Sequence, residues 1–239
     1  MDDCTYLIYT HSDFDDILEI TLKRIQKFFA SVVVSICTNN ASLIDEKYKD
    51  IYNIQHVYEY DDSLTYSQKV ASVLERISTT YVLFNHDHNI LFNDVNVCIL
   101  RSIMDEMTKN GIDTVRLSTD GVDDPIMDDS SLLKKNTGPY YFSVSSAIWR
   151  THSIFSLFTK YESSTYRNIE YACQEYAAQL KNYYISSSHD SPHCCSCYYP
   201  FVHTTRYSKW LLHNNKDKII DMAKEYSIDL YIRGVTYNL

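Results

Sequence analysis

The first half of the chain alternates between short apolar runs and longer segments in which apolar residues recur at helical spacing. The apolar runs predict buried strands at residues 5–10, 32–37, 56–60 and 81–84. In segments 14–29 and 65–77 apolar residues fall every three or four positions, which predicts two helices, and a shorter polar helix is expected at 45–52. Strands separated by helices favour an α/β fold with a mostly parallel central sheet flanked by helices.

Local signals mark the ends of two helices. Thr65 and Gln68 have the spacing of a capping box, and Gly111 is placed to end a third helix that closes at about residue 110. The second half predicts strands at 113–118, 140–149, 183–186 and 197–203, and helices at 153–161, 166–180 and 215–226. Residues 119–139 are acidic and are expected to form a loop. Since no repeat or linker composition divides the chain, we expect a single domain over residues 1–239.

The fourth predicted strand runs directly into a cluster of polar residues: Asn85, His86, Asp87, His88 and Asn89. Potential metal ligands at the carboxyl end of a central strand indicate a functional site, because parallel sheets collect their ligands at this edge. Alternation along an extended segment places His86 and His88 on one side and Asp87 on the other. An alternative stays open, in which the histidines only cap backbone groups at the end of the strand.

Composition narrows the classes of function. The formal net charge is 22 − 31 = −9 with no basic block, which argues against nucleic acid as a partner. The four glycines are isolated and exclude a P-loop or a Gly-rich dinucleotide turn, so the charge of a bound diphosphate must be neutralised in another way, such as by a divalent cation.

No apolar run approaches the roughly 18 residues of a membrane span, and no signal-peptide pattern is present, so a cytoplasmic location is expected. The seven scattered cysteines predict reduced thiols.

Several segments follow one another in a characteristic order. They are the helix opened by Tyr66-Ser67-Gln68-Lys69, the strand YVLFNHDHNILF, the segment YFSVSSAIWR at 141–150, the segment Tyr166–Glu170, and PFVHTTRYSKW at 200–210. Together they resemble the GT-A fold glycosyltransferases, in which an apolar strand ends in a D-x-D-type motif. The resemblance spans roughly residues 5–212, and the motif here contains one carboxylate instead of two. It implies a GT-A-like sheet with a nucleotide-sugar-binding half at about 1–118 and a smaller acceptor-side half at about 119–239.

The resemblance also implies a reaction. A sugar would pass from a nucleoside diphosphate sugar to a hydroxyl of a glycan or other acceptor, through an oxocarbenium-like transition state and with inversion. Positive charge at the leaving diphosphate would come from Mn²⁺ or Mg²⁺ and from Arg206 and Lys209. Glu170 is the expected base, with Glu175 as a substitute, and Trp149 is expected to stack on the acceptor. The expected metal ligands are Asp87, His88, His86 and His203.

Residues at the ends of the other predicted strands are candidate contacts to the donor: Thr10, His11, Asp13, Asp61 and Asp62, together with Lys69 and Asp87. Asp13 and Asp62 could equally be helix caps. Similarly, Trp149 could be a core residue and Glu170 a solvated acid on a helix face. A further group, His189, His193, Cys194, Cys195 and Cys197, lacks the paired spacing of a structural zinc site, so a reduced cysteine-rich loop is expected there.

Two alternatives come from other classes of function. A metal-dependent hydrolase could use His86, Asp87, His88 and Glu170, and it would release its product into water without needing an acceptor. A non-catalytic module could keep the α/β scaffold and bind a nucleotide or sugar without turnover.

Overall fold

The computed structural model describes residues 3–118, 132–138, 140–185, 198–206, 208–213 and 215–237. The predicted acidic loop lies mostly outside these ranges, as do His189, His193 and the cysteines at 194, 195 and 197. The strands are β1 (Cys4–Tyr9), β2 (Val34–Thr38), β3 (Ile54–Glu59), β4 (Tyr81–His86), β5 (Asn89–Leu91), β6 (Thr114–Arg116), β7 (Leu133–Lys135), β8 (Ala147–Arg150), β9 (Asn182–Ile185), β10 (Phe201–His203), β11 (Thr205–Arg206), β12 (Lys209–Leu211) and β13 (Val235–Thr236). The helices are α1 (Asp15–Phe28), α2 (Ala41–Lys47), α3 (Tyr66–Leu74), α4 (Val97–Asn110), α5 (Thr151–Lys160), α6 (Ile169–Ala172), α7 (Gln174–Ala177), α8 (Lys216–Glu225) and α9 (Leu230–Arg233), with a 3-10 turn at Ser12–Phe14.

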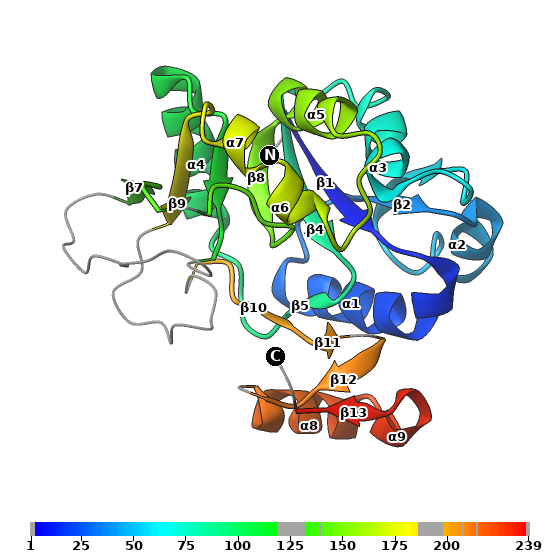
Figure 1. Cartoon of the computed structure of the whole chain (residues 1–239). Helices are drawn as coiled ribbons and strands as arrows, with labels where there is room; N and C mark the ends of the chain where they lie inside the picture. The colour runs from blue at the N-terminus through cyan, green and yellow to red at the C-terminus, as the bar shows by residue number, and fades with distance from the viewer. Residues whose placement is uncertain are drawn as a thin grey trace.

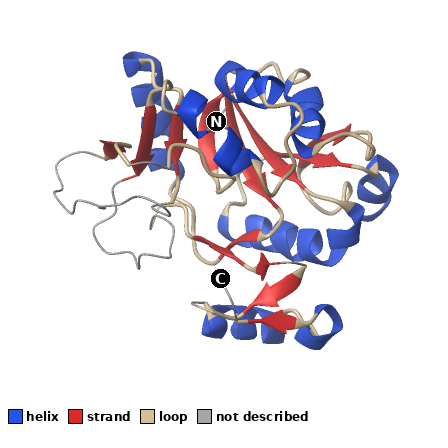
Figure 2. Cartoon of the chain, in the orientation of Figure 1, coloured by secondary structure: helices blue, strands red, loops and turns tan. Residues whose placement is uncertain are grey.

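An eight-stranded sheet in the order β3-β2-β1-β4-β8-β6-β9-β7 forms the centre of the molecule (Figures 1 and 2). The strands from β3 to β4 are parallel, as their helical crossovers require. β8 runs antiparallel to both β4 and β6, β9 is parallel to β6, and β7 is antiparallel to β9. The α/β class with a sheet flanked by helices is confirmed, with a parallel half and a mixed half.

Helices bury both faces of this sheet, so neighbouring residues of one strand belong to different cores. Ile8 and Leu83 lie in a core with residues of α1 and α4, whereas Leu7 and Val82 lie in a core with residues of α3 and α5. Side chains alternate between the faces of a strand, and a strand covered on both faces reads as the unbroken apolar run seen in the sequence.

Both predicted helix-end signals are confirmed. Thr65 and Gln68 form a reciprocal capping box at the start of α3, and Gly111 ends α4 in the left-handed conformation with φ 61°. This conformation carries a steric cost for residues with a Cβ atom, which explains the glycine.

Several predicted elements are wrong in extent or position. The helix expected at 45–52 is α2 at Ala41–Lys47, and the strand expected at 197–203 is reduced to β10 at Phe201–His203. The strand expected at 140–149 is reduced to β8, because the backbone N–H groups of Tyr141 and Phe142 donate to the Gln174 side chain instead of to a neighbouring strand. The long helix expected at 166–180 is split into α6 and α7, which meet at Cys173 with φ −98° and ψ 1°. The short strands β5, β11, β12 and β13 and the helix α9 were not expected, and β7 lies within the segment 119–139 that was expected to be a loop.

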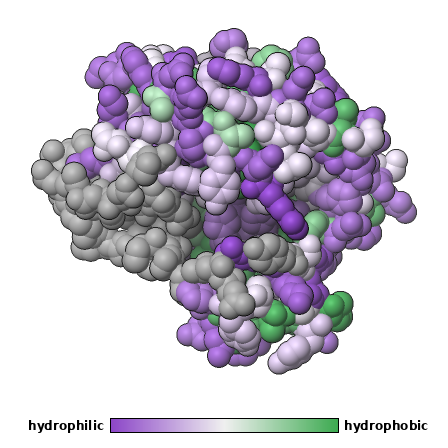
Figure 3. Space-filling view, in the orientation of Figure 1, coloured by the Kyte–Doolittle hydropathy of each residue, from purple (hydrophilic) through white to green (hydrophobic). Residues whose placement is uncertain are grey.

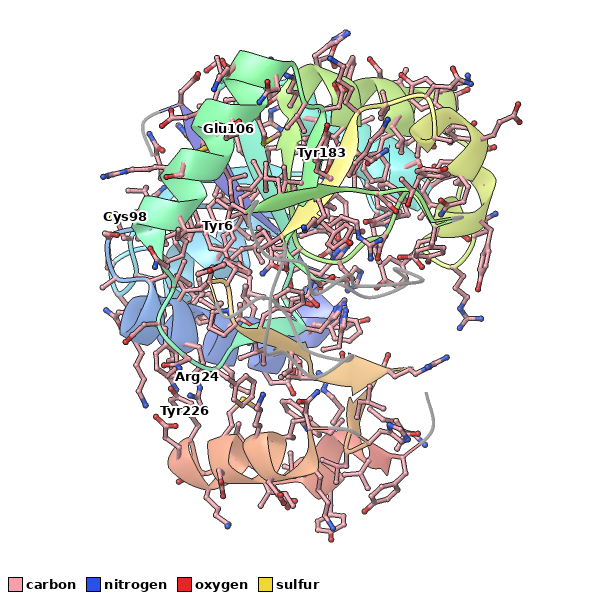
Figure 4. All side chains as sticks on the ribbon, turned by 90° about the vertical axis from the view of Figure 1, so that its left-hand side faces the viewer. Tyr6, Arg24, Cys98, Glu106, Tyr183 and Tyr226 are labelled. Atoms are coloured by element: carbon pink, nitrogen blue, oxygen red, sulfur yellow. The ribbon has the colours of Figure 1, made fainter. Side chains whose placement is uncertain are left out.

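The C-terminal unit, comprising α8, α9 and the small sheet β11-β12-β13, packs against α1 (Figure 1). Arg24 of α1 points toward Tyr226 at the end of α8 (Figure 4), with its guanidinium 5.1 Å from that ring and 3.0 Å from the Glu225 carboxylate. The visible face of the molecule is mostly hydrophilic, with hydrophobic residues at the surface near α9 (Figure 3). Among the described residues, no helix combines the length and apolar character needed to cross a bilayer.

Candidate donor and acceptor site

Thr10 and Asp87 meet at the carboxyl edge of the sheet, where the chain leaves the neighbouring strands β1 and β4. The Thr10 hydroxyl donates to Asp87 Oδ2 at 2.6 Å, and both side chains are buried. The Asp87 N–H donates to the Tyr9 carbonyl at 3.1 Å, and the Thr21 hydroxyl donates to the Asp87 carbonyl. Asp87 is therefore held at the main chain and at one carboxylate oxygen, with Oδ1 left on the side toward His88.

His88 faces the same carboxylate, since its Nδ1 lies 3.5 Å from Asp87 Oδ1. Its own carbonyl accepts hydrogen bonds from the N–H and the hydroxyl of Thr204, both at 2.9 Å. Thr204 directly follows β10, which pairs with β5 just beyond the polar cluster. Thr204 thus fixes the backbone of His88, whose imidazole faces the Asp87 carboxylate.

His86 is a structural partner within this edge of the sheet. Its Nδ1 lies 3.1 Å from the Val144 carbonyl, which can only accept, so this nitrogen carries the proton. Its Nε2 then accepts from the Tyr66 hydroxyl at 2.8 Å. Burial, followed by the proximity of His88, holds the pKa of His86 well below its usual range, so the ring is neutral. Because both nitrogens have protein partners, the metal-ligand role expected for His86 does not fit this arrangement.

The three histidines form a stacked column. The centroids of His86 and His88 are 5.3 Å apart and those of His88 and His203 are 5.5 Å apart, with interplanar angles of 25° and 28°. His203 Nε2 lies 3.3 Å from the Ser145 hydroxyl, and burial followed by His88 lowers the pKa of His203 to about 3. His86 and His88 stack as the expected alternation implies, but Asp87 is not on the opposite side, because its Oδ1 lies 3.5 Å from His88 Nδ1 in the turn after β4. Stacked rings do not converge on one point, and the described residues contain no group of three or more His, Cys, Asp or Glu arranged to hold a metal ion.

A second cluster joins the ends of β1 and β3 to the start of α3. Asp62 accepts from Lys69 Nζ at 2.5 Å and lies 3.1 Å from His11 Nε2, and these contacts, Lys69 first, lower the pKa of Asp62. The Tyr60 hydroxyl donates to the Thr10 carbonyl at 2.8 Å, which links this cluster to Asp87. The carboxyl edge of the sheet therefore brings together five of the predicted donor contacts: Thr10, His11, Asp62, Lys69 and Asp87.

Neither a scan against protein-family models nor a search of curated proteins found a match. Among solved structures, residues 1–349 of Staphylococcus aureus TarS match with 12% identity and a TM-score of 0.53, covering 95% of this chain and 64% of that one. The same fragment in complex with UDP matches at 13% identity and 0.53 (93% and 65% covered), and in complex with UDP-GlcNAc at 13% and 0.51 (93% and 66%). The chain has a GT-A-like fold. It spans less than two thirds of the TarS fragment.

Within this GT-A-like fold, Glu170 of α6 holds the segment that precedes β8, and it binds Val144, whose carbonyl contacts His86 at the end of β4. Its Oε1 accepts from the Val144 N–H at 2.7 Å and from the Ser143 hydroxyl at 3.1 Å, and its Oε2 accepts from the Tyr140 hydroxyl at 2.5 Å. The alternative of a solvated acid on a helix face is wrong, because the carboxylate is engaged by three protein donors.

Two other predicted residues do not fit their roles. Trp149 is 1% exposed, pairs with Val82 and Thr114 toward the opposite end of the sheet, and packs on Phe142, so it is a core residue and not an acceptor platform. Glu175 is exposed on α7, on the far side of Cys173 from Glu170, and is not directed at the site.

The remaining donor candidates lie at the periphery of the site. Asp13 and Asp61 are exposed, and Asp61 accepts from the N–H and the hydroxyl of Ser63 as a turn residue. Arg206 and Lys209 face each other across the β11-β12 hairpin, which starts one residue after Thr204. The hairpin that carries both cations is thus continuous in sequence with Thr204, which binds the His88 carbonyl.

Sequence reasoning missed the role of several residues that shape the site. Tyr66 was predicted only as the first residue of a helix, yet its hydroxyl contacts His86. Asn39 was not among the predicted site residues, yet its Nδ2 lies 3.2 Å from His11 Nε2. The position of Asn39 directly after a buried strand was the available signal, because it matches that of Thr10 and Asp87.

Proposed function

We propose that the protein is a glycosyltransferase that moves a sugar from a nucleoside diphosphate sugar to a hydroxyl acceptor. The observation that carries the proposal is the meeting of predicted donor residues at one sheet edge, with Thr10 bound to Asp87 at 2.6 Å and His88 facing the same carboxylate. The GT-A-like fold supports it, and so do the UDP and UDP-GlcNAc complexes of TarS. These two nucleotides are therefore the first donors to test.

Asp87 and His88 are the residues that would hold a divalent cation. One carboxylate and one imidazole directed at a common space fit a cation whose other ligands are phosphate oxygens and water, and the carboxylate suits Mn²⁺ or Mg²⁺. When bound, such a cation would neutralise charge on the diphosphate. Arg206 and Lys209, on the hairpin beside the site, would bind the same diphosphate through their side chains.

Glu170 is the proposed base of a direct displacement with inversion. The acceptor oxygen forms a bond to the anomeric carbon, the bond from that carbon to the diphosphate oxygen breaks with its electron pair going to the diphosphate, and the hydroxyl proton passes to Glu170. The hydrogen bonds from Tyr140, Ser143 and Val144 fix the carboxylate in place for this transfer.

The test is thermal unfolding with nucleoside diphosphates and their sugars, each with Mn²⁺, Mg²⁺ or chelator. A ligand present at 100 times its dissociation constant stabilises the folded state by about 2.7 kcal/mol, which corresponds to a rise of roughly 5–10 °C in Tm for a chain of this size. Asp87→Ala should lose most of this rise and most transferase activity, whereas Asp221→Ala, an exposed aspartate of α8, should keep both.

The alternative outcomes separate the other classes of function. If no nucleotide raises Tm, the donor site is refuted. Nucleotide binding followed by sugar release into water, with no dependence on an acceptor, would favour the hydrolase. Nucleotide binding without any turnover would favour the binding module.

A further inference from the structure

Tyr166 lies in the turn before α6, and its ring closes over the histidine column. The ring stands edge-on to Tyr66 at 5.2 Å, to His86 at 5.5 Å and to His88 at 6.4 Å. It is nevertheless 41% exposed. The packed edge fixes the orientation of the ring, and the rest of it faces solvent at the carboxyl end of β4.

The turn that carries Tyr166 is itself fixed. Asn168 Oδ1 accepts from the N–H of Thr165 at 2.7 Å and from its hydroxyl at 3.1 Å. The Ser164 carbonyl accepts from the Ser67 N–H at the start of α3 at 3.2 Å. An exposed ring on an anchored turn loses little conformational entropy when a ligand binds to it.

The phenol of Tyr166 is close enough to the two carboxylates on which the proposed reaction depends, Glu170 and Asp87, for their charges to act on it. A phenol is protonated at neutral pH, so the Tyr166 hydroxyl can donate a hydrogen bond.

A second exposed aromatic residue comes directly after Glu170 in the sequence. Tyr171, the next residue along α6, is 77% exposed, and its hydroxyl is close enough to Tyr140 to affect the pKa of that phenol. Rings with a polar end and an exposed apolar face match sugars, whose C–H faces are apolar and whose rims carry hydroxyls.

We infer that Tyr166 and Tyr171 form an acceptor platform for a saccharide. The sugar ring lies on their exposed faces, and the Tyr166 hydroxyl donates to a sugar oxygen beside Glu170. The inference rests on the proposed transferase function and specifies its acceptor as a carbohydrate. The platform takes the place that sequence reasoning gave to Trp149.

The test uses lactose, maltose, cellobiose and chitobiose as probes, with saturation-transfer NMR on the full chain in the presence of the nucleotide that raises Tm. We expect at least one disaccharide to receive saturation at its ring protons. Its affinity should fall tenfold or more in Tyr171→Ala and Tyr166→Ala and severalfold in Tyr166→Phe, which keeps the ring. Tyr231→Ala, a tyrosine of α9 that is 84% exposed, should bind as the wild type does.

Tyr171→Ala removes an exposed side chain and should fold normally, so it decides the outcome even if Tyr166→Ala is unstable. If no disaccharide binds, or if binding is equal in Tyr171→Ala, the platform is refuted. Nucleotide-induced stabilisation must persist in Tyr171→Ala, which separates this failure from failure of the donor site. Where turnover is measurable, Tyr171→Ala should raise KM for the acceptor and leave KM for the donor unchanged.

Discussion

Replacing Thr10 by valine removes one hydroxyl and keeps the shape of the side chain. In the wild type this hydroxyl donates to Asp87 at 2.6 Å, and the two side chains are 2% and 5% exposed, so water cannot easily substitute for it. A hydrogen bond to a charged group contributes about 1.5–3 kcal/mol, and a buried acceptor left without a donor costs an amount in the same range. His88 Nδ1, 3.5 Å from the other oxygen, offsets part of the loss.

We therefore expect Thr10→Val to lower the free energy of unfolding by about 2 kcal/mol. For a chain of this length this corresponds to a fall of roughly 4–8 °C in Tm. Urea unfolding in the presence of chelator measures the change. A double-mutant cycle with Asp87→Asn should then give a coupling energy of about 1–2 kcal/mol, since the pair is in direct contact.

Thr114→Val is a matched control. Thr114 is a fully buried strand residue whose hydroxyl has no hydrogen-bond partner in the described part of the chain, so its removal should be neutral or slightly stabilising. Equal effects of the two substitutions would show that Thr10 contributes only packing at this edge, and would refute the preorganised Asp87 on which the donor site depends.

Two further predictions concern the fold around the site. With a folded pKa of about 3, below the usual value near 6.5, His203 binds its proton more readily in the unfolded chain, so its contribution to stability is complete above about pH 6.5 and is lost as pH falls toward 3. Between pH 7 and 5 the wild type should lose about 1–2 kcal/mol more than His203→Gln in urea unfolding, and parallel pH profiles would contradict this. Gly111 has a φ of 61°, so Gly111→Ala should lower the free energy of unfolding by about 1–2 kcal/mol, and Gly111→Asn should lower it by less. An alanine variant as stable as the wild type would refute the backbone strain expected at this position.

The sequence predicted the parallel half of the sheet because the signals there are local. An apolar run that is buried on both faces, a capping box at Thr65 and a glycine after α4 are each decided by a few neighbouring residues. The same holds for Thr10, His11 and Asp87, since residues that follow parallel strands meet at one edge regardless of the loops between them.

The segment 140–150, on the proposed acceptor side, was less predictable because long-range contacts decide its conformation. The segment 140–146 has the composition of a strand, but Gln174, more than thirty residues away, takes the N–H groups that a strand would give to its neighbour. Trp149 is a residue type that often stacks on sugars. The antiparallel pairing of β8 with β4, however, places it opposite Val82, at the end of the sheet away from Asp87. Direction in a sheet is a property of the pairing, which no pattern within 140–150 encodes.

The two halves of the site are joined by one chain of hydrogen bonds. Glu170 binds the Val144 N–H, the Val144 carbonyl accepts from His86, and His86 accepts from Tyr66 at the start of α3. A substitution at Glu170 can therefore shift His86, at the proposed donor side of the site, through the backbone of Val144 alone. In Glu170→Gln one oxygen can still accept from Val144, so the chain is preserved while the base is removed. Loss of turnover with intact nucleotide binding in this variant would assign Glu170 to proton transfer, and loss of both would make it a positioning residue.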